Sequence, residues 1–361
     1  MSTLTSARYI VYDSCKDRLG GETVQHRAFA SAIVLSLLAC IAASCAFAQK
    51  EVEKVVIARQ PGIQFLPVIV MEGNKLLEKH LKLAGLGDVP VSWFTFAGGA
   101  ETNNAILSGS AHFAMGGVPP LLTLWDKTRG NVDVKGVAAL SSYRFYLNTR
   151  NPAVNSIKDF TDKDRIALPG VKVSMGAVVL QMMVAGAYGM ENFDKLDHLT
   201  VSMSFPDGMA ALFNPQSEIT AHFASPPFHY HELKRAGVHK VMDSYDVLGP
   251  ATTNVIFTTA KFRDQNSKTY AAFLAALDEA MQLIKNDKKT AAEIYLRISN
   301  DKRTTLPEML EMLNDPEIIF TATPFNTMKW VDFMYRVKSI KNKPDTWKDL
   351  FFPNIHNLSG S

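Results

Sequence analysis

A histidine-rich stretch in the middle of the chain is the first place where residue types and spacing suggest chemistry. The segment 229–231 reads His-Tyr-His and lies between His222 and His239. Imidazole nitrogens are common ligands of divalent metal ions. However, Pro226-Pro227 predict the start of a helix, on which residues two apart point about 200° away from each other. The two histidines of 229–231 would then not face one ion, so a metal-ion-binding protein using 222–239 is kept as an alternative.

The cysteine distribution excludes thiol chemistry for most of the chain. The three cysteines are Cys15, Cys40 and Cys45, and none follows residue 48. The rest of the chain has no thiol for a nucleophile, a disulfide, an iron–sulfur cluster or a zinc site. No Gly-x-Ser-x-Gly, Walker or Gly-x-Gly-x-x-Gly pattern falls between an expected strand and an expected helix. We therefore expect no catalytic residues, no metal site and no cofactor, and interpret the protein as a non-enzyme.

The composition is that of a globular protein with a large core. The 361 residues are 47% hydrophobic and 20% charged, with a mean hydropathy of −0.01. The formal net charge of +3, from 38 basic and 35 acidic residues, is too close to neutrality to indicate nucleic acid as the main partner. The length favours two lobes.

The first 48 residues have the order of a secretory signal peptide. Arg27 precedes an apolar stretch over 28–43, and Ala46-Phe47-Ala48 form a small-x-small cleavage site. An apolar stretch of 16 residues is short against the roughly 20 that span a bilayer, which favours removal of 1–48 over a membrane anchor. Lipid attachment at either nearby cysteine fits the flanking residues poorly. We therefore expect export to the periplasm.

Expected strands and helices alternate along the rest of the chain. Short apolar runs predict strands at 54–58, 91–96, 111–115 and 134–140, and a second series at 171–173, 199–203 and 219–223. Proline and serine signals predict helices between them, including one helix from Pro67 to Gly85. The alternation indicates an α/β protein with mostly parallel sheets flanked by helices. Beyond residue 260 the pattern predicts a C-terminal helical extension.

Several loop sequences in a fixed order carry a family resemblance. They are GGAETNNAILSG (98–109), FAMGGVPPLL (113–122), YLNTRNP (146–152), VKVSMGAVVLQ (171–181), FPDGMAAL (205–212) and FASPPF (223–228). Over roughly 51–350 the chain resembles the periplasmic solute-binding proteins of the nitrate, sulfonate and taurine class of ABC importers. The resemblance implies a two-lobe, Venus-flytrap fold of the type II periplasmic-binding-protein kind. We expect crossovers near 147–152 and 252–259, which give lobe I as 51–148 plus 256–361 and lobe II as 149–255.

The resemblance also implies a function. It predicts a solute-binding subunit that captures a small organic molecule or monoanion, of sulfonate, nitrate, aromatic acid or pyrimidine type. The partners would be the ABC permease and ATPase subunits at the inner membrane, and the protein itself would be a monomer. Two alternatives stay open: an enzyme on the same fold, whose pyrimidine-making branch uses a cysteine-rich site that this chain lacks, and a sensor that uses the same lobes without transport.

The ligand should lie between the lobes, at the carboxyl ends of strands and at helix starts. The loops expected there, 61–73, 97–104, 115–124, 174–181, 204–210 and 224–230, contain no Lys or Arg. Their composition favours a neutral or singly charged ligand, or an anion held by backbone N–H groups. The ligand-binding residues predicted on this basis are Gln64, Phe65, Gly98, Gly99, Thr102, Gly117, Val118, Ser174, Met175, Gly176, Phe205, Asp207, Ser225 and Phe228.

Three further polar residues have a structural and a functional interpretation. His112 occupies a position where many members of this family have Asp, and His222 occupies the matching place in the second lobe. We favour buried, hydrogen-bonded histidines over a direct role in the cleft. Asp207 is interpreted as the cap of a helix that starts at Gly208, with a ligand contact as the alternative. Arg59 and Arg144 are the nearby cations, and both are expected to be surface or lobe-packing residues.

Overall fold

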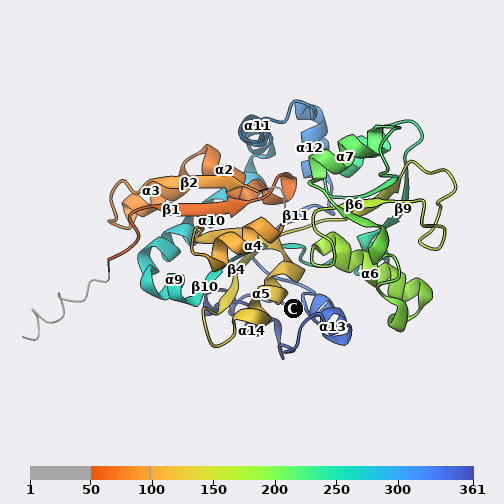
Figure 1. The fold of residues 1–361 in the computed structure, drawn as a ribbon. Helices are drawn as coiled ribbons and strands as arrows, with labels where there is room; N and C mark the ends of the chain where they lie inside the picture. The colour runs from red at the N-terminus through yellow and green to blue at the C-terminus, as the bar shows by residue number, and fades with distance from the viewer. Residues whose placement is uncertain (1–49, 97–98) are drawn as a thin grey trace, which may run out of the picture. The chain divides into compact units, whose positions relative to one another are not determined.

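Two mixed β-sheets organise residues 50–96 and 99–361, the part of the chain that the computed structural model describes (Figure 1). The first sheet has the order β11-β4-β10-β3-β1-β2 and the second has the order β7-β6-β8-β5-β9. The strands of the first sheet are β1 (Val55–Arg59), β2 (Val91–Thr95), β3 (Phe113–Gly117), β4 (Val134–Ser142), β10 (Asn254–Thr259) and β11 (Ile319–Phe320). Those of the second sheet are β5 (Tyr146–Thr149), β6 (Ile166–Leu168), β7 (Thr200–Ser202), β8 (Ala221–Ala224) and β9 (His239–Asp243).

The antiparallel pairs involve the strands that arrive from the other sheet, β5 and β10, and the short edge strand β11, which pairs with β4. β1 pairs in parallel with β2 and β3, whereas β10 lies antiparallel between β3 and β4. In the second sheet β6 pairs in parallel with β7 and β8, and β5 lies antiparallel between β8 and β9. The predicted α/β fold with mostly parallel strands is confirmed, and the crossing strands β5 and β10 explain why the sheets are mixed.

Helices cover the sheets and connect the strands. Those between strands are α2 (Leu66–Gly73), α3 (Leu76–Leu83), α4 (Gly99–Leu107), α5 (Val118–Thr128), α6 (Met175–Tyr188), α7 (Phe205–Phe213) and α8 (Phe228–Leu233). The predicted C-terminal extension contains α9 (Ala260–Gln265), α10 (Ser267–Asn286), α11 (Lys288–Ser299), α12 (Leu306–Asn314), α13 (Met328–Arg336) and α14 (Trp347–Leu350).

The core on the first sheet forms around α10. Its fully buried Phe273 stacks on Phe113 of β3, with ring centroids 3.9 Å apart. Tyr270, Leu277 and Ile284 are buried on the same face of the helix, as their spacing predicts. Along the chain α2 and α3 both lie between β1 and β2, and α10 packs against these two helices. This packing fixes the strand ends from which the cavity loops start.

Two expected elements differ from the observed ones. The single helix predicted from Pro67 to Gly85 is divided into α2 and α3, because Lys75 adopts a left-handed conformation with φ 51°. The strand predicted at 171–173 is a turn, and the strand lies earlier, at β6. Val171 and Val173 are exposed, so their strand propensity has no burial to support it.

The positions of the crossing strands also refine the expected connections. The chain leaves the first sheet after Ser142 and enters the second at Tyr146, so β5 occupies part of the crossover expected at 147–152. It returns at Asn254, within the expected segment 252–259. The division of the remaining elements into the two predicted lobes stays a prediction. Residues 51–361 form one compact unit.

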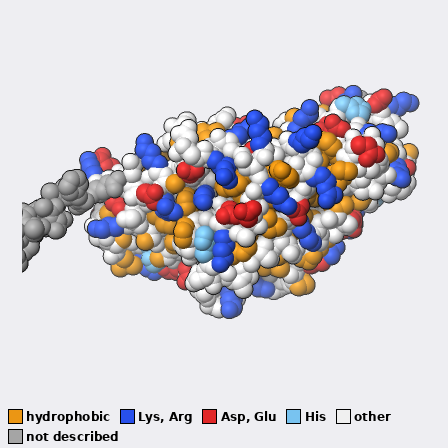
Figure 2. All heavy atoms as spheres, turned by 90° about the horizontal axis from the view of Figure 1, so that it is seen from below, with side chains coloured by type: hydrophobic (Ala, Val, Ile, Leu, Met, Phe, Trp, Pro, Cys, Tyr) orange, Lys and Arg blue, Asp and Glu red, His pale blue; other side chains and the backbone are white. Residues whose placement is uncertain are grey.

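The exterior is mixed in charge. Figure 2 shows Lys and Arg side chains interspersed with Asp and Glu over the face seen from below, in keeping with the near-neutral total. The predicted signal peptide, 1–48, lies outside the described residues. Within the described ranges, every helix is too short or too polar to cross a membrane.

Candidate ligand-binding site

A small cavity lies where loops of the two sheets meet. Its volume is about 40 Å³, which holds roughly three water molecules. We call it the inner cavity. Its lining residues are Gln60, Gln64, Phe65, Gly99, Gly117, Pro120, Tyr143, Phe145, Pro169, Ser174, Met175, Gly176, Phe205 and Asn254.

Helix starts converge on the inner cavity from both sheets. α4 and α5 begin at Gly99 and just after Gly117, and α6 and α7 begin just after Ser174 and at Phe205. The first amide groups of a helix have no acceptor within it, and the helix dipole makes this end positive. The backbone therefore offers hydrogen-bond donors and partial positive charge to the cavity. Ser174 closes the start of α6, where its Oγ accepts a hydrogen bond from the Ala177 N–H at 3.2 Å.

Gly117 allows the starts of two of these helices to approach closely. A Cβ atom at this position would lie 3.1 Å from Cβ of Met175, the first residue of α6. Such a separation is below ordinary van der Waals contact, so a side chain here would push α6 away from α5. The glycine thus permits the narrow cavity.

Aromatic rings form one wall of the inner cavity. Tyr143 and Phe145 belong to the connection from the first sheet to the second, with ring centroids 4.9 Å apart, and Phe205 of α7 lies 6.3 Å from Phe145. The Tyr143 hydroxyl donates a hydrogen bond to Asn254 Oδ1 at 2.7 Å. Burial raises the pKa of Tyr143, so the hydroxyl stays protonated at neutral pH.

The cavity is uncharged, with a few polar groups among mostly apolar side chains. No Lys, Arg, His, Asp or Glu is among the described residues that line it. Gln64 is buried, and its Nε2 donates to the Pro61 carbonyl at 3.2 Å, which fixes the orientation of the amide. Its Oε1 is buried without a hydrogen-bond partner. A buried acceptor of this kind is costly unless a ligand or water satisfies it.

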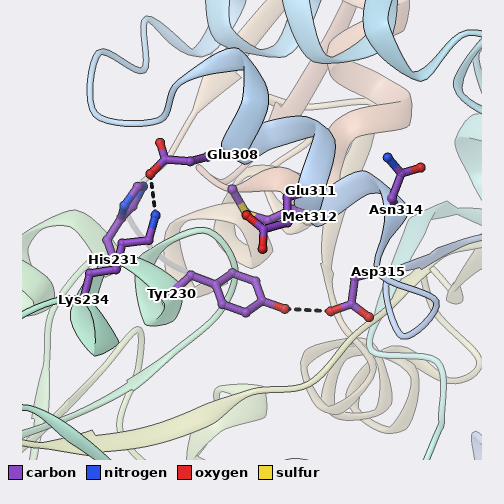
Figure 3. A pocket seen from close by; sticks show the side chains of 8 residues that line it. All are labelled: Tyr230, His231, Lys234, Glu308, Glu311, Met312, Asn314 and Asp315. Atoms are coloured by element: carbon purple, nitrogen blue, oxygen red, sulfur yellow. Dashed lines mark hydrogen bonds and ion pairs between the residues drawn. The ribbon is translucent and has the colours of Figure 1, made fainter.

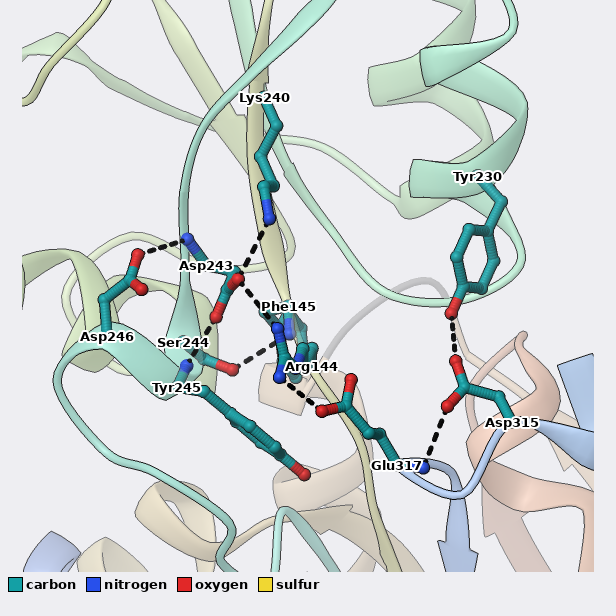
Figure 4. Close-up of polar contacts among 10 residues, drawn as sticks. All are labelled: Arg144, Phe145, Tyr230, Lys240, Asp243, Ser244, Tyr245, Asp246, Asp315 and Glu317. Atoms are coloured by element: carbon teal, nitrogen blue, oxygen red, sulfur yellow. Dashed lines mark hydrogen bonds and ion pairs between the residues drawn. The ribbon is translucent and has the colours of Figure 1, made fainter.

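The two cations expected near the cleft are engaged elsewhere. Arg59 forms an ion pair with Glu72, with a separation of 2.9 Å. Arg144 lies between Asp243, at 3.3 Å, and Glu317 (Figure 4). Both therefore serve packing, as the sequence interpretation holds, and neither lines the inner cavity.

The structure brings together eight of the predicted ligand-binding residues and separates the others. Those that line the inner cavity are Gln64, Phe65, Gly99, Gly117, Ser174, Met175, Gly176 and Phe205. Those that do not line it are Thr102, Val118, Asp207, Ser225 and Phe228, while Gly98 lies outside the described residues. Their role in binding stays a prediction.

Asp207 is not the helix cap that the sequence suggested. Ser204 precedes α7, and its Oγ accepts the Asp207 N–H at 3.3 Å. The Asp207 carboxylate in turn accepts a hydrogen bond from the Ser204 hydroxyl at 2.5 Å. The cap is therefore three residues earlier than expected, because the serine side chain reaches the first-turn amide and the aspartate supports it.

Several lining residues were missed because they come from segments without a recognisable motif. Tyr143, Phe145 and Asn254 lie where the chain changes sheet. The only sequence signal for them was their proximity to the expected crossovers, because a ligand that contacts both halves must bind near the segments that connect them.

Neither His112 nor His222 lines the inner cavity. The His112 ring accepts the Val56 N–H at 3.2 Å and stacks on Phe262, and burial lowers its pKa. The His222 Nδ1 lies 2.5 Å from Glu232 Oε1, and both side chains are fully buried. These contacts agree with the interpretation of both as structural histidines.

The histidines of segment 229–231 point in different directions from α8. His229 is buried, its Nδ1 donates to the Ala224 carbonyl at 3.1 Å, and burial lowers its pKa to about 3. His231 instead lies 2.9 Å from the Thr304 hydroxyl. Among the described residues, no group of three His, Cys, Asp or Glu side chains is placed to hold a metal ion.

Polar contacts join α8 to the C-terminal helices. The Tyr230 hydroxyl donates to Asp315 Oδ2 at 2.9 Å, and Asp315 also accepts the Glu317 N–H at 2.8 Å (Figure 4). Lys234 pairs with Glu308 of α12. These contacts flank a pocket of about 420 Å³ between α8 and α12, shown in Figure 3. They connect a helix of the second sheet to a helix of the C-terminal extension.

Solved structures of binding proteins share this fold. The alkanesulfonate-binding protein SsuA from Xanthomonas axonopodis pv. citri, bound to MOPS, is 15% identical, with a TM-score of 0.64 over 81% of this chain and 96% of that one. The aliphatic sulphonate-binding protein SsuA from Escherichia coli is 18% identical, with a TM-score of 0.59 over 83% and 99%. The nitrate-binding protein NrtA from Synechocystis PCC 6803 is 16% identical, with a TM-score of 0.57 over 75% and 74%. At these identities the likeness shows the periplasmic-binding-protein fold.

Sequence comparison supplies the family. No curated protein sequence matches the chain. The family model described as NMT1/THI5 like matches residues 91–291, which is more than half of the chain and includes most of the inner cavity. Together with the shared fold, this match confirms the resemblance drawn from the loop sequences, and the protein belongs to the NMT1/THI5-like family.

Proposed function

We propose that the protein is the solute-binding subunit of an ABC importer. It captures a small organic molecule or monoanion between its two sheets and delivers it to permease and ATPase subunits at the inner membrane. It acts as a monomer in the periplasm after removal of residues 1–48. The observation that carries the proposal is the inner cavity, whose lining comes from helix starts of both sheets.

The lining supports an organic ligand with an apolar part. Phe65, Tyr143, Phe145 and Phe205 offer ring faces, while Gln64 offers an unsatisfied acceptor. Convergent polar groups in a mostly apolar pocket are typical of small-molecule sites. A volume of about 40 Å³ is far below the roughly 300 Å³ or more of such sites. Binding therefore requires the two halves to separate and close again around the ligand.

The same lining supports binding without catalysis. Two candidate titratable groups are held in structural pairs outside the lining, Arg59 with Glu72 and His222 with Glu232. A general acid or base has to reach the reacting atoms. The described lining residues include no Lys, Arg, His, Asp or Glu, and the hydroxyl of the lining Tyr143 donates a hydrogen bond to Asn254 while burial raises its pKa. We therefore propose that the ligand leaves unaltered.

A thermal-shift screen of the purified protein tests the function. The panel contains nitrate, benzoate, benzenesulfonate, benzamide and uracil, because a compound that binds only the folded state raises the melting temperature. We expect at least one compound to shift it, and chromatography of the incubated compound to show no conversion. Consumption of the compound, or no shift from any panel member, would count against the proposal.

A further inference from the structure

A larger pocket adjoins the inner cavity. Its volume is about 370 Å³, and we call it the outer pocket. It is formed by the loop after β1, by α7 and α8 of the second sheet, and by the end of α11 with the loop that follows. The lining residues are Pro61, Gly62, Pro206, Met209, Pro227, Phe228, His231, Tyr295, Ser299, Asn300, Asp301, Lys302 and Arg303.

Side chains that touch each other separate the two spaces. Phe205 lines the inner cavity and Phe228 lines the outer pocket, and their rings stack with centroids 5.8 Å apart. Gln64 lines the inner cavity and lies against Gly62 of the outer pocket, since a Cβ on Gly62 would be 2.2 Å from Gln64 Oε1. The Phe205–Phe228 stack and the Gln64 amide therefore form the boundary between the two spaces, and a ligand that occupies both must displace them.

The outer pocket carries the charge that the inner cavity lacks. Lys302 and Arg303 both line it, both are exposed, and neither side chain has an ion-pair partner among the described residues. Asp301 also lines the pocket, but its carboxylate accepts the Arg303 N–H at 2.9 Å, the Thr304 N–H at 3.2 Å and the Thr304 hydroxyl at 2.7 Å. Asp301 thus shapes the loop that presents the two cations.

The charge balance of the pocket is positive by one. Two cations stand against one carboxylate, and burial lowers the pKa of His231, so this side chain is neutral at pH 7. A ligand with a single negative charge would compensate this net positive charge. A ligand with two or more negative charges would leave the pocket with a net negative charge.

We propose that the outer pocket binds the anionic end of the ligand while the uncharged body lies in the inner cavity. This inference rests on the proposed function and narrows its ligand to one class. The class is an organic monoanion with an aromatic or apolar body and a carboxylate or sulfonate at one end. The residues that select it are Lys302 and Arg303, which lie in the C-terminal extension and outside the loops from which the sequence predicted binding residues.

A graded series of compounds tests the inference. The probes are benzoate, 3-phenylpropionate and 5-phenylvalerate, each paired with its uncharged amide, and calorimetry measures their Kd with the purified protein. Within the series one carboxylate should bind more tightly than its amide. The double variant K302Q/R303Q should weaken binding of that carboxylate roughly twofold to thirtyfold, the range for two solvent-exposed ion pairs, and leave the affinity for its amide unchanged.

A matched variant controls for the loss of two positive charges. Lys261 and Lys268 are exposed on α9 and α10 and line none of the pockets described above. The variant K261Q/K268Q should bind every probe as the parent does. Raising the salt concentration should narrow the gap between carboxylate and amide in the parent and not in K302Q/R303Q.

The outcomes separate the two proposals. If probes bind but K302Q/R303Q leaves the carboxylate affinity unchanged, the outer pocket does not hold the anion, and the binding function stands. If the amides bind as well as the carboxylates, the inference also fails. If no probe binds and the screen of small ions and heterocycles is also negative, both proposals are contradicted.

Discussion

Removal of the hydrogen bond between Tyr230 and Asp315 is the most direct test of how the two halves of the protein close around a ligand. It joins α8 of the second sheet to the segment that follows α12 (Figure 4). Burial, followed by the hydrogen bond to Asp315, raises the pKa of Tyr230, so the hydroxyl remains a donor throughout the neutral range. Tyr230→Phe removes this donor and keeps the ring.

The expected cost follows from the geometry. A hydrogen bond to a charged acceptor contributes about 1.5–3 kcal/mol. Asp315 keeps the Glu317 N–H as a donor, and Tyr230 is only partly buried, so we take about 1–2 kcal/mol for Tyr230→Phe. If the contact exists only when the halves are together, closure weakens by this amount, and the Kd of a bound probe rises roughly fivefold to thirtyfold.

Calorimetry and hydrogen exchange together check this prediction. We expect weaker binding of the best probe and faster amide exchange in α8 and α12 of the ligand-free variant. Tyr335→Phe is the control, because Tyr335 is 46% exposed on α13 and should behave as the parent. Unchanged affinity together with unchanged exchange in Tyr230→Phe would refute the role of this contact in closure.

Three other substitutions probe the cavity, the core and the pH response. Gly117→Ala should displace the start of α6 and weaken probe binding, measured by calorimetry, by about 1–3 kcal/mol. Gly186→Ala is the control, because the added Cβ would meet nothing within 4 Å, and it should leave probe binding unaltered. Equal effects of the two substitutions would contradict the inference that Gly117 allows α5 and α6 to approach closely. Phe273→Ala should lower the free energy of unfolding by about 3–5 kcal/mol in urea titrations, and a loss below 1 kcal/mol would show that the α10 stack is not central. The pKa of His229 is about 3 in the folded protein, against an ordinary value of 6.5. Between pH 6.5 and pH 3 the imidazole therefore binds a proton in the unfolded chain but not in the folded one. The free energy of unfolding should consequently fall as the pH drops from 6.5 toward 3. His229→Asn should therefore remove up to about 2 kcal/mol of the stability difference between pH 7 and pH 5, and identical pH profiles for variant and parent would contradict the assignment.

Local signals in the sequence predicted local features well. Pro119-Pro120 and Ser174 mark helix starts that the structure places at the inner cavity. The apolar spacing in α10 marks the buried face of that helix. Such features depend on neighbouring residues, so the chain itself carries the information. The strand expected at 171–173 failed because propensity without burial does not decide a strand.

The absence of charged side chains from the inner cavity could also be predicted from the sequence. Loops that precede helices supply its lining, and their lack of Lys and Arg could be read directly. The resemblance to the nitrate, sulfonate and taurine class of binding proteins could be recognised from the sequence too, because an ordered set of loop motifs carries it without any one specific signature.

Tertiary structure alone decided which distant segments share a pocket. Asn254 accepts the Tyr143 hydroxyl across 111 positions of sequence, and Lys302 and Arg303 line the outer pocket together with Pro61 and Gly62. These neighbours are set by strands that cross between sheets and by helices that fold back onto them. No periodicity or spacing encodes such contacts, because they depend on how whole elements pack against each other rather than on what lies next along the chain.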